Sequence, residues 1–158
     1  MQAKLVLIVF AVLLPLALFG WLSSHSPDLL SPSKQNSGMK RMLVGTVPIT
    51  VEVAETVVAQ TRGLSGRDAL PENTGLLFSF SEDETHGIWM KDMRFPIDIV
   101  WAGSDGTIVH LESAVSPDTY PRVFAPNEPS RYVLELPAGF LDVHDIAVGD
   151  KLSVPLDL

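Results

Sequence analysis

The chain has 158 residues, with 11 Lys or Arg against 19 Asp or Glu, and a formal net charge of −8. It contains no cysteine, so a hydrophobic core must stabilise the fold without disulfides. The acidic balance argues against nucleic acid and anionic headgroups as partners, because both are bound through clustered Lys and Arg.

An apolar run occupies the N-terminus. Residues 5–22, LVLIVFAVLLPLALFGWL, carry no charge, and a membrane-spanning helix needs about 17–25 apolar residues. We expect residues 1–22 to form a hydrophobic helix that serves as a signal anchor, or as a signal peptide with its apolar region divided at Pro15. Lys4 favours an N-terminus inside the cell. The prediction is a cell-envelope location: inner-membrane anchored with the domain outside the cytoplasm, or periplasmic or secreted after cleavage.

Residues 23–39 are rich in Ser, Pro and Asn, which predicts a flexible linker. Residues 40–158 are long enough for a single globular domain. This part has nine basic and eighteen acidic residues, a net charge of −9. Solubility is the simplest explanation for that charge.

The domain begins with strand-like alternation at Ile49–Ala54. A short helix is predicted over about residues 56–64, with Val57, Val58 and Leu64 near one face. Asp105-Gly106 predicts a tight hairpin, and residues 81–87 and the proline-rich residues 115–130 are predicted loops. Six further short strands are predicted at 76–80, around Trp89, and at 97–101, 107–114, 131–136 and 151–155. The pattern predicts a mainly β domain, a sandwich or barrel of short antiparallel strands.

Four motifs occur in order: TRGLSGRDALPENTGLLFSF, WMKDMRFPIDIVW, YVLELPAGF and IAVGDKL. Together they resemble the prokaryotic family called domain of unknown function 192, over Val51–Leu152. The resemblance implies a compact, mainly β domain of jelly-roll type, often behind a signal or anchor, with no activity attached to the family. The chain departs from the family pattern at Ser65, usually Met, and at Asp92-Met93, usually Asn-Thr.

Asp98 lies inside the apolar strand Ile97–Trp101. A buried carboxylate without a partner would cost several kcal/mol, and Arg is the natural partner because it stays charged and binds bidentately. We therefore predict that Arg62 or Arg67 pairs with Asp98. Such a pair either locks the helix to the sheet, which is the interpretation we favour, or forms the floor of a pocket.

Trp89 and Met90 are adjacent in a predicted strand, so their side chains should point to opposite faces. One should lie in the core, and the other should be exposed or line a groove beside Lys91. A core tryptophan is the commoner arrangement, but an exposed one is a platform for carbohydrate rings. The predicted binding residues are Arg62, Arg67, Trp89, Lys91 and Asp98, with residues 115–130 as a rim.

Two alternatives remain open. A hydrolase acting on envelope polymers could use Asp98 with Glu135 or Glu112, if two of these carboxyl groups lie about 5–9.5 Å apart in a cleft; periodicity places Glu112 and Glu135 on a solvated face by default. A Cu(I)-handling protein would require soft ligands to converge. Its candidates are Met39, Met42, Met90, Met93, His86, His110 and His144.

The favoured function is a non-catalytic, membrane-tethered envelope domain that binds a small ligand, carbohydrates included, or a partner protein. Catalytic signatures such as His-Glu-x-x-His, a Walker loop or Gly-x-Ser-x-Gly do not occur in the sequence. We expect no cofactor, no metal and no nucleic-acid partner.

Overall fold

The computed structural model describes residues 38–155. The predicted hydrophobic helix and most of the predicted linker lie outside this range. Within it, no helix has the length and apolar character needed to cross a membrane. The elements are β1 Met39–Val44, β2 Val47–Ala54, α1 Val57–Arg62, β3 Thr74–Glu84, β4 Ile88–Trp89, β5 Ile97–Ala102, β6 Ile108–Val115, the 3-10 helix η1 Pro117–Thr119, β7 Val123–Phe124, β8 Ser130–Pro137, α2 Phe140–Val143 and β9 Leu152–Ser153.

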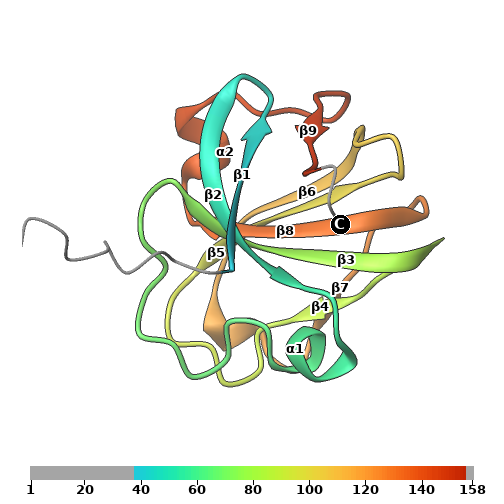
Figure 1. The fold of residues 1–158 in the computed structure, drawn as a ribbon. Helices are drawn as coiled ribbons and strands as arrows, with labels where there is room; N and C mark the ends of the chain where they lie inside the picture. The colour runs from blue at the N-terminus through green and yellow to red at the C-terminus, as the bar shows by residue number, and fades with distance from the viewer. Residues whose placement is uncertain (1–37, 156–158) are drawn as a thin grey trace, which may run out of the picture. The chain divides into compact units, whose positions relative to one another are not determined.

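A curled sheet of seven strands forms the body of the domain, in the order β6-β5-β8-β3-β2-β1-β9 (Figure 1). β4 and β7 form a separate two-stranded sheet. The mainly β prediction is confirmed, but the jelly-roll arrangement is not, because the long strands belong to one half-barrel sheet. β2 and β3 pair in parallel, whereas the other pairs among the described strands are antiparallel. The all-antiparallel prediction is therefore wrong for that pair, whose connection crosses over through α1.

Three predicted segments differ from the structure. β1 begins at Met39, which we predicted to be linker, and pairs with β2 along its whole length. β3 continues through Glu84, where a loop was predicted, and Glu84 pairs with Ser130 after an irregularity in the register. Residues 81–84 are exposed, so polar side chains follow the strand there without interrupting it. β7 Val123–Phe124 lies inside residues 115–130, which we predicted to be a loop. The remaining strands and the short helix overlap the segments that the sequence predicted.

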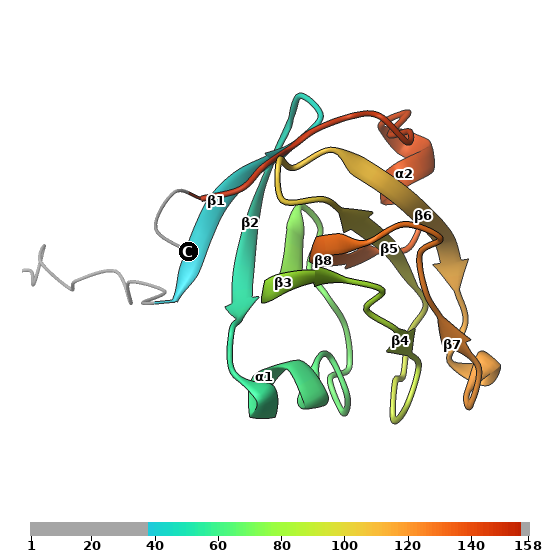
Figure 2. The ribbon, with the colours of Figure 1, turned by 90° about the vertical axis from the view of Figure 1, so that its right-hand side faces the viewer.

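Each face of the sheet carries a core, because successive strand residues point to opposite sides. The first core includes Leu77, Val100, Leu134 and Leu136 together with Phe140 and Leu141 of α2 and Leu152 of β9. The second core includes Phe78, Ile99, Trp101 and Val133 together with Leu64, Ile88 and Phe124. Figure 2 shows α1, β4 and β7 on one side of the central strands and α2 on the other.

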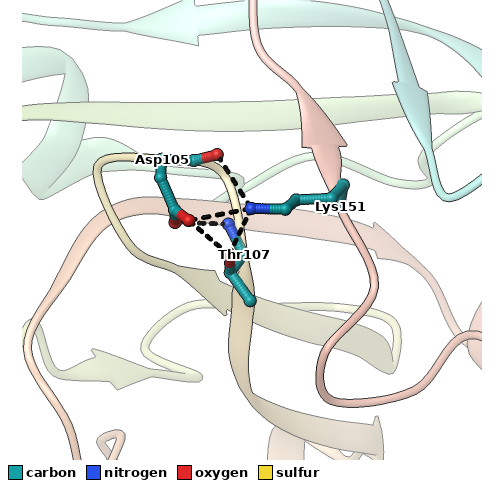
Figure 3. A network of polar contacts seen from close by, with 3 residues as sticks. All are labelled: Asp105, Thr107 and Lys151. Carbon is teal, nitrogen blue, oxygen red and sulfur yellow. Dashed lines mark hydrogen bonds and ion pairs between the residues drawn. The ribbon is translucent and has the colours of Figure 1, made fainter.

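The segment around β9 joins the two edges of the curled sheet. β9 pairs with β1 on one side, while Lys151 bridges to Thr107 on the other. Three polar side chains reinforce this closure (Figure 3): the Lys151 ammonium donates to Asp105 Oδ2 at 2.8 Å, and the Thr107 hydroxyl donates to the same oxygen at 2.7 Å. These donors hold the pKa of the Asp105 carboxyl well below its usual range. The predicted hairpin at Asp105-Gly106 is thus confirmed and forms part of the closure.

Candidate functional site

A groove lies between α1 and β4, above the second core. Its deep part is a cavity of about 50 Å³, lined by the end of α1, Phe78, Met93 and Glu135 among others. An adjoining hollow of about 250 Å³ extends along Phe80 and His86. Trp89 and the α1 residues Gln60 and Thr61 border both spaces. We call these two spaces together the α1–β4 groove.

Polar contacts hold α1 beside the groove. The Thr56 hydroxyl accepts from the Ala59 amide at 3.2 Å and caps the helix. The Gln60 side-chain amide donates to the Ala54 carbonyl at 3.2 Å and to the Ser79 carbonyl at 2.9 Å, which ties the helix to β2 and β3.

The apolar face predicted for α1 does not pack as a unit. Val57 and Val58 are 78% and 80% exposed, and only Leu64 beyond the helix is buried. The six-residue helix is too short to turn all three side chains toward the sheet. The hydrogen bonds of Gln60 therefore hold α1 against the sheet, and the two valines face solvent.

Two loops join at the edge of the groove. The Ser65 hydroxyl donates to the Lys91 carbonyl at 2.8 Å, and the Gly66 amide donates to the Asp92 carbonyl at 2.9 Å. Asp92 has a φ of 57°, a conformation that Asn and Asp tolerate better than other residues. The two positions where the chain departs from the family pattern thus meet here, and Ser65 has a structural role in fixing the loops.

Glu135 of β8 lies at the bottom of the cavity. Its side chain is 4% exposed, and its Oε2 has no hydrogen-bond partner among residues 38–155. Burial raises the pKa of Glu135 to about 8, an effect that the nearby charge of Arg67 partly offsets. The carboxyl group is therefore protonated at neutral pH, when it can donate as well as accept a hydrogen bond.

The solvated face predicted for Glu135 is wrong. β8 lies between β3 and β5 and is covered on both faces. A polar residue at an alternating position of this strand is therefore buried. The available signal was the run of apolar residues around it, Val133, Leu134 and Leu136, which is typical of a strand buried on both sides.

The predicted pairing of Asp98 with Arg62 or Arg67 is also wrong. Asp98 Oδ1 accepts from the Ala114 amide at 2.7 Å, and Oδ2 accepts from the Leu141 amide at 2.9 Å. Alternation along β5 turns Asp98 toward the first core, on the face opposite α1. Asp98 is a buried acid whose charge is satisfied by backbone donors, and Glu135 occupies the floor of the groove in its place.

Arg67 donates from its two terminal guanidinium nitrogens to the two carboxylate oxygens of Glu52 of β2, at 2.7 and 2.8 Å. This hydrogen bonding lowers the pKa of Glu52 and raises that of Arg67. The pair fixes Arg67 near Glu135, close enough for the positive charge of Arg67 to act on the Glu135 carboxyl group. Arg62 is exposed and lines the deep cavity without an ion pair among the described residues.

Trp89 forms the outer wall of the groove. It is 45% exposed and Met90 is 1% exposed, which confirms that the two side chains point to opposite faces. The ring of Tyr120 packs edge-on against Trp89, with centroids 6.1 Å apart, and the Lys91 ammonium lies 5.7 Å from the ring centroid. Tyr120 belongs to residues 115–130, so this segment contributes to the surroundings of Trp89.

The structure separates the residues of the two alternative sites. Asp98 and Glu135 face opposite sides of the sheet, so they cannot flank one glycosidic bond. Glu112 of β6 and Glu135 of β8 point to the same face of the sheet, but Ile99 of β5 pairs with both and lies between them. Glu112 Oε1 lies 3.4 Å from His110 Nε2.

The proposed Cu(I) ligands do not converge either. Met42 lies in the first core, whereas Met90 and Met93 lie in or against the second. His86 stacks on Phe80 and His144 packs on Phe140, in different parts of the domain. Among residues 38–155, no three His, Asp or Glu side chains are grouped as metal ligands.

Comparison with known proteins decides the family. The model of DUF192, described as Uncharacterized ACR, matches residues 40–154. The chain belongs to the DUF192 family. A UPF0127 protein from Thermococcus gammatolerans is 30% identical over 105 residues, and the match covers 65% of this chain and 65% of that relative's own length.

Two crystal structures resemble this DUF192 domain. One, described as a candidate transcription regulator from Sinorhizobium meliloti 1021, has a TM-score of 0.67 and 31% identity, covering 72% of this chain and 89% of that chain. The other, a protein of unknown function from Novosphingobium aromaticivorans, has a TM-score of 0.68 and 24% identity, covering 73% and 85%. The second likeness concerns the fold alone.

Proposed function

We propose that this DUF192 domain is a non-catalytic, envelope-tethered module that binds carbohydrate in the α1–β4 groove. The observation that carries the proposal is a half-exposed Trp89 at the mouth of a groove whose floor is the buried, unpartnered carboxyl of Glu135. Aromatic rings offer sugars an apolar face, and a few placed polar groups then fix orientation.

Charge supports a neutral ligand over nucleic acid. The domain carries a net charge of −9, and nucleic-acid binding requires clustered cations. Near the groove, Arg67 is already engaged by Glu52, which leaves Arg62 and Lys91 as scattered rim charges. The regulator description of the S. meliloti relative therefore does not extend to this chain in our proposal.

Thermal unfolding of the full chain, purified in a detergent without a sugar headgroup, tests the proposal against a panel of mono- and disaccharides. A sugar at 100 times its dissociation constant adds about 2.7 kcal/mol to the stability of the folded state, so binding appears as a clear rise in melting temperature. We expect Trp89→Ala to abolish that rise and Val143→Ala, an exposed apolar residue of α2, to preserve it. A panel without any shift would reject carbohydrate binding.

The location is proposed from residues 1–22 alone, whose apolar run and basic start favour an anchor. Protease added to spheroplasts should digest the domain while leaving a cytoplasmic marker intact. Survival of the domain until the cells are lysed would contradict this orientation.

A protein partner is the second candidate, favoured by one observation. Val57 and Val58 project into solvent beside the groove, where exposed apolar side chains together with an aromatic residue are typical of protein contacts. Crosslinking from position 58 in intact cells, with position 143 as the control, would separate this candidate from sugar binding. An identical pattern of products from both positions would reject it.

A further inference from the structure

We propose that the α1–β4 groove selects sugars that carry an acetamido group, with the amide bound by Glu135 and the methyl group held in the deep cavity. This inference rests on the proposed function, since it names the class of carbohydrate. It assigns the ring and its substituent to different parts of the groove. Three observations lead to it: the size of the cavity, the chemistry of its walls and the charges around it.

The size of the deep cavity suits a substituent and excludes a sugar ring. Its volume is about 50 Å³, a few times the roughly 10–15 Å³ that a cavity needs to hold one water. The adjoining hollow of about 250 Å³ is the larger space, and Trp89 borders both. A ring in the outer hollow, beside the indole, would therefore direct one small substituent inward.

The walls of the deep cavity carry polar side chains, Gln60, Thr61, Arg62 and Ser65, as well as apolar ones, and one buried carboxyl group lies among them. Leu64, Phe78, Ile88 and Met93 supply the apolar part, and Glu135 supplies the buried polar part. A methyl group gains free energy from leaving water for the apolar part of these walls. The amide beside the methyl group brings one acceptor and one donor. A neutral carboxylic acid offers the complementary donor and acceptor.

The charges near Glu135 disfavour a cationic substituent. Arg67 follows α1 and acts on Glu135, although Glu52 of β2 partly neutralises it. Arg62 of α1 lines the same cavity, and Lys91 stands beside Trp89. An ammonium group would approach these cations and would have to ionise Glu135 to find a counter-charge. A neutral amide avoids both costs.

Protonation of Glu135 makes the recognition depend on pH. Burial raises the pKa of Glu135 to about 8, against the opposing effect of Arg67. Below that value the carboxyl group donates to the amide carbonyl, and above it the donor is lost. The affinity for an acetamido sugar should therefore be constant at lower pH and fall by about tenfold for each pH unit well above 8.

The test is fluorescence or calorimetric titration of the full chain, in the detergent described above, with N-acetylglucosamine, glucose and glucosamine. At pH 6.5 we expect N-acetylglucosamine to bind at least tenfold more tightly than either of the others. Glu135→Gln should keep this preference at both pH 6.5 and pH 9.5, because a carboxamide donates and accepts at every pH. Glu135→Leu should lose the preference, while the wild type should lose it only at pH 9.5.

The outcomes separate this inference from the proposed function. Equal affinity for glucose and N-acetylglucosamine, still dependent on Trp89, would overturn the acetamido inference and leave carbohydrate binding intact. Tightest binding of glucosamine would also overturn it, in favour of a cation site. Failure of every sugar to bind would overturn both. The comparison of pH 6.5 with pH 9.5 needs no substitution, and glucose, whose affinity should be the same at both pH values, reports that the wild type is still folded at pH 9.5.

Discussion

Substituting Glu135 by glutamine should remove a large pH dependence from the stability of the domain. The pKa of Glu135 rises from 4.5 to about 8 on folding, and each tenfold change in an acid constant is worth about 1.4 kcal/mol. Between these pH values the folded state holds a proton that the unfolded state has released. The free energy of unfolding should therefore fall by about 5 kcal/mol as pH rises through this window, and then level off.

Glutamine has nearly the same shape as protonated glutamate and does not titrate. Urea denaturation followed by circular dichroism, from pH 4 to pH 9, should show Glu135→Gln gaining about 5 kcal/mol relative to wild type across the range. Because domains of this kind have only about 5–15 kcal/mol in total, the wild type should be marginal at pH 9. The exposed residue Glu128 provides the matched control, and Glu128→Gln should retain the wild-type dependence. If the free energy of unfolding changed with pH in the same way in wild type and Glu135→Gln, the conclusion that Glu135 is a neutral buried acid would be refuted.

Three further substitutions test other parts of the structure. Asp98→Ala should lower the free energy of unfolding by about 3–5 kcal/mol, because the Ala114 and Leu141 amides lose a charged acceptor; a loss below 1 kcal/mol in urea denaturation would contradict this role. Arg67→Lys keeps the charge but loses the bidentate contact with Glu52, and since both side chains are partly exposed, the same assay should show a loss of only about 1 kcal/mol. Gly106→Ala places a methyl carbon 2.4 Å from the Leu152 carbonyl oxygen, so hydrogen exchange at the Leu152 and Ile108 amides should accelerate. Gly139→Ala imposes a similar backbone strain in open space and should leave those two amides unchanged.

Local pattern was sufficient for most strands and insufficient for their arrangement. β2, β5 and β8 follow from runs of apolar and alternating residues, and the Asp105-Gly106 turn follows from its residue types. The parallel pairing of β2 with β3 depends on where the connection through α1 returns, which no short window records. β1 was missed because its hydrophobic residues are interleaved with Lys40 and Arg41.

The sequence indicated two residues that line the groove, Trp89 and Arg62, and placed the wrong acid at its floor. Trp89, Lys91, Arg62 and Arg67 were predicted from residue type, and the structure brings them to one region. Asp98 and Glu135 are each a single acid in an apolar strand, and the two cannot be told apart without knowing which face lies under α1. The partner of Asp98 on α2, the Leu141 amide, is a backbone group 43 residues away, so side-chain chemistry gave no sign of it.

The closure at β9 has a consequence for how the domain is made. Leu43 and Ser153 pair although they lie near opposite ends of the described chain, so this contact cannot form until nearly all of the polypeptide has been synthesised. Contacts of such long sequence separation slow folding, because the cost of closing the loop comes before the gain from the contact. During synthesis the nascent chain therefore stays unfolded for longer than a helical domain of the same size would. In the envelope setting proposed above, that delay would keep the chain competent for translocation until the whole of it has crossed the membrane.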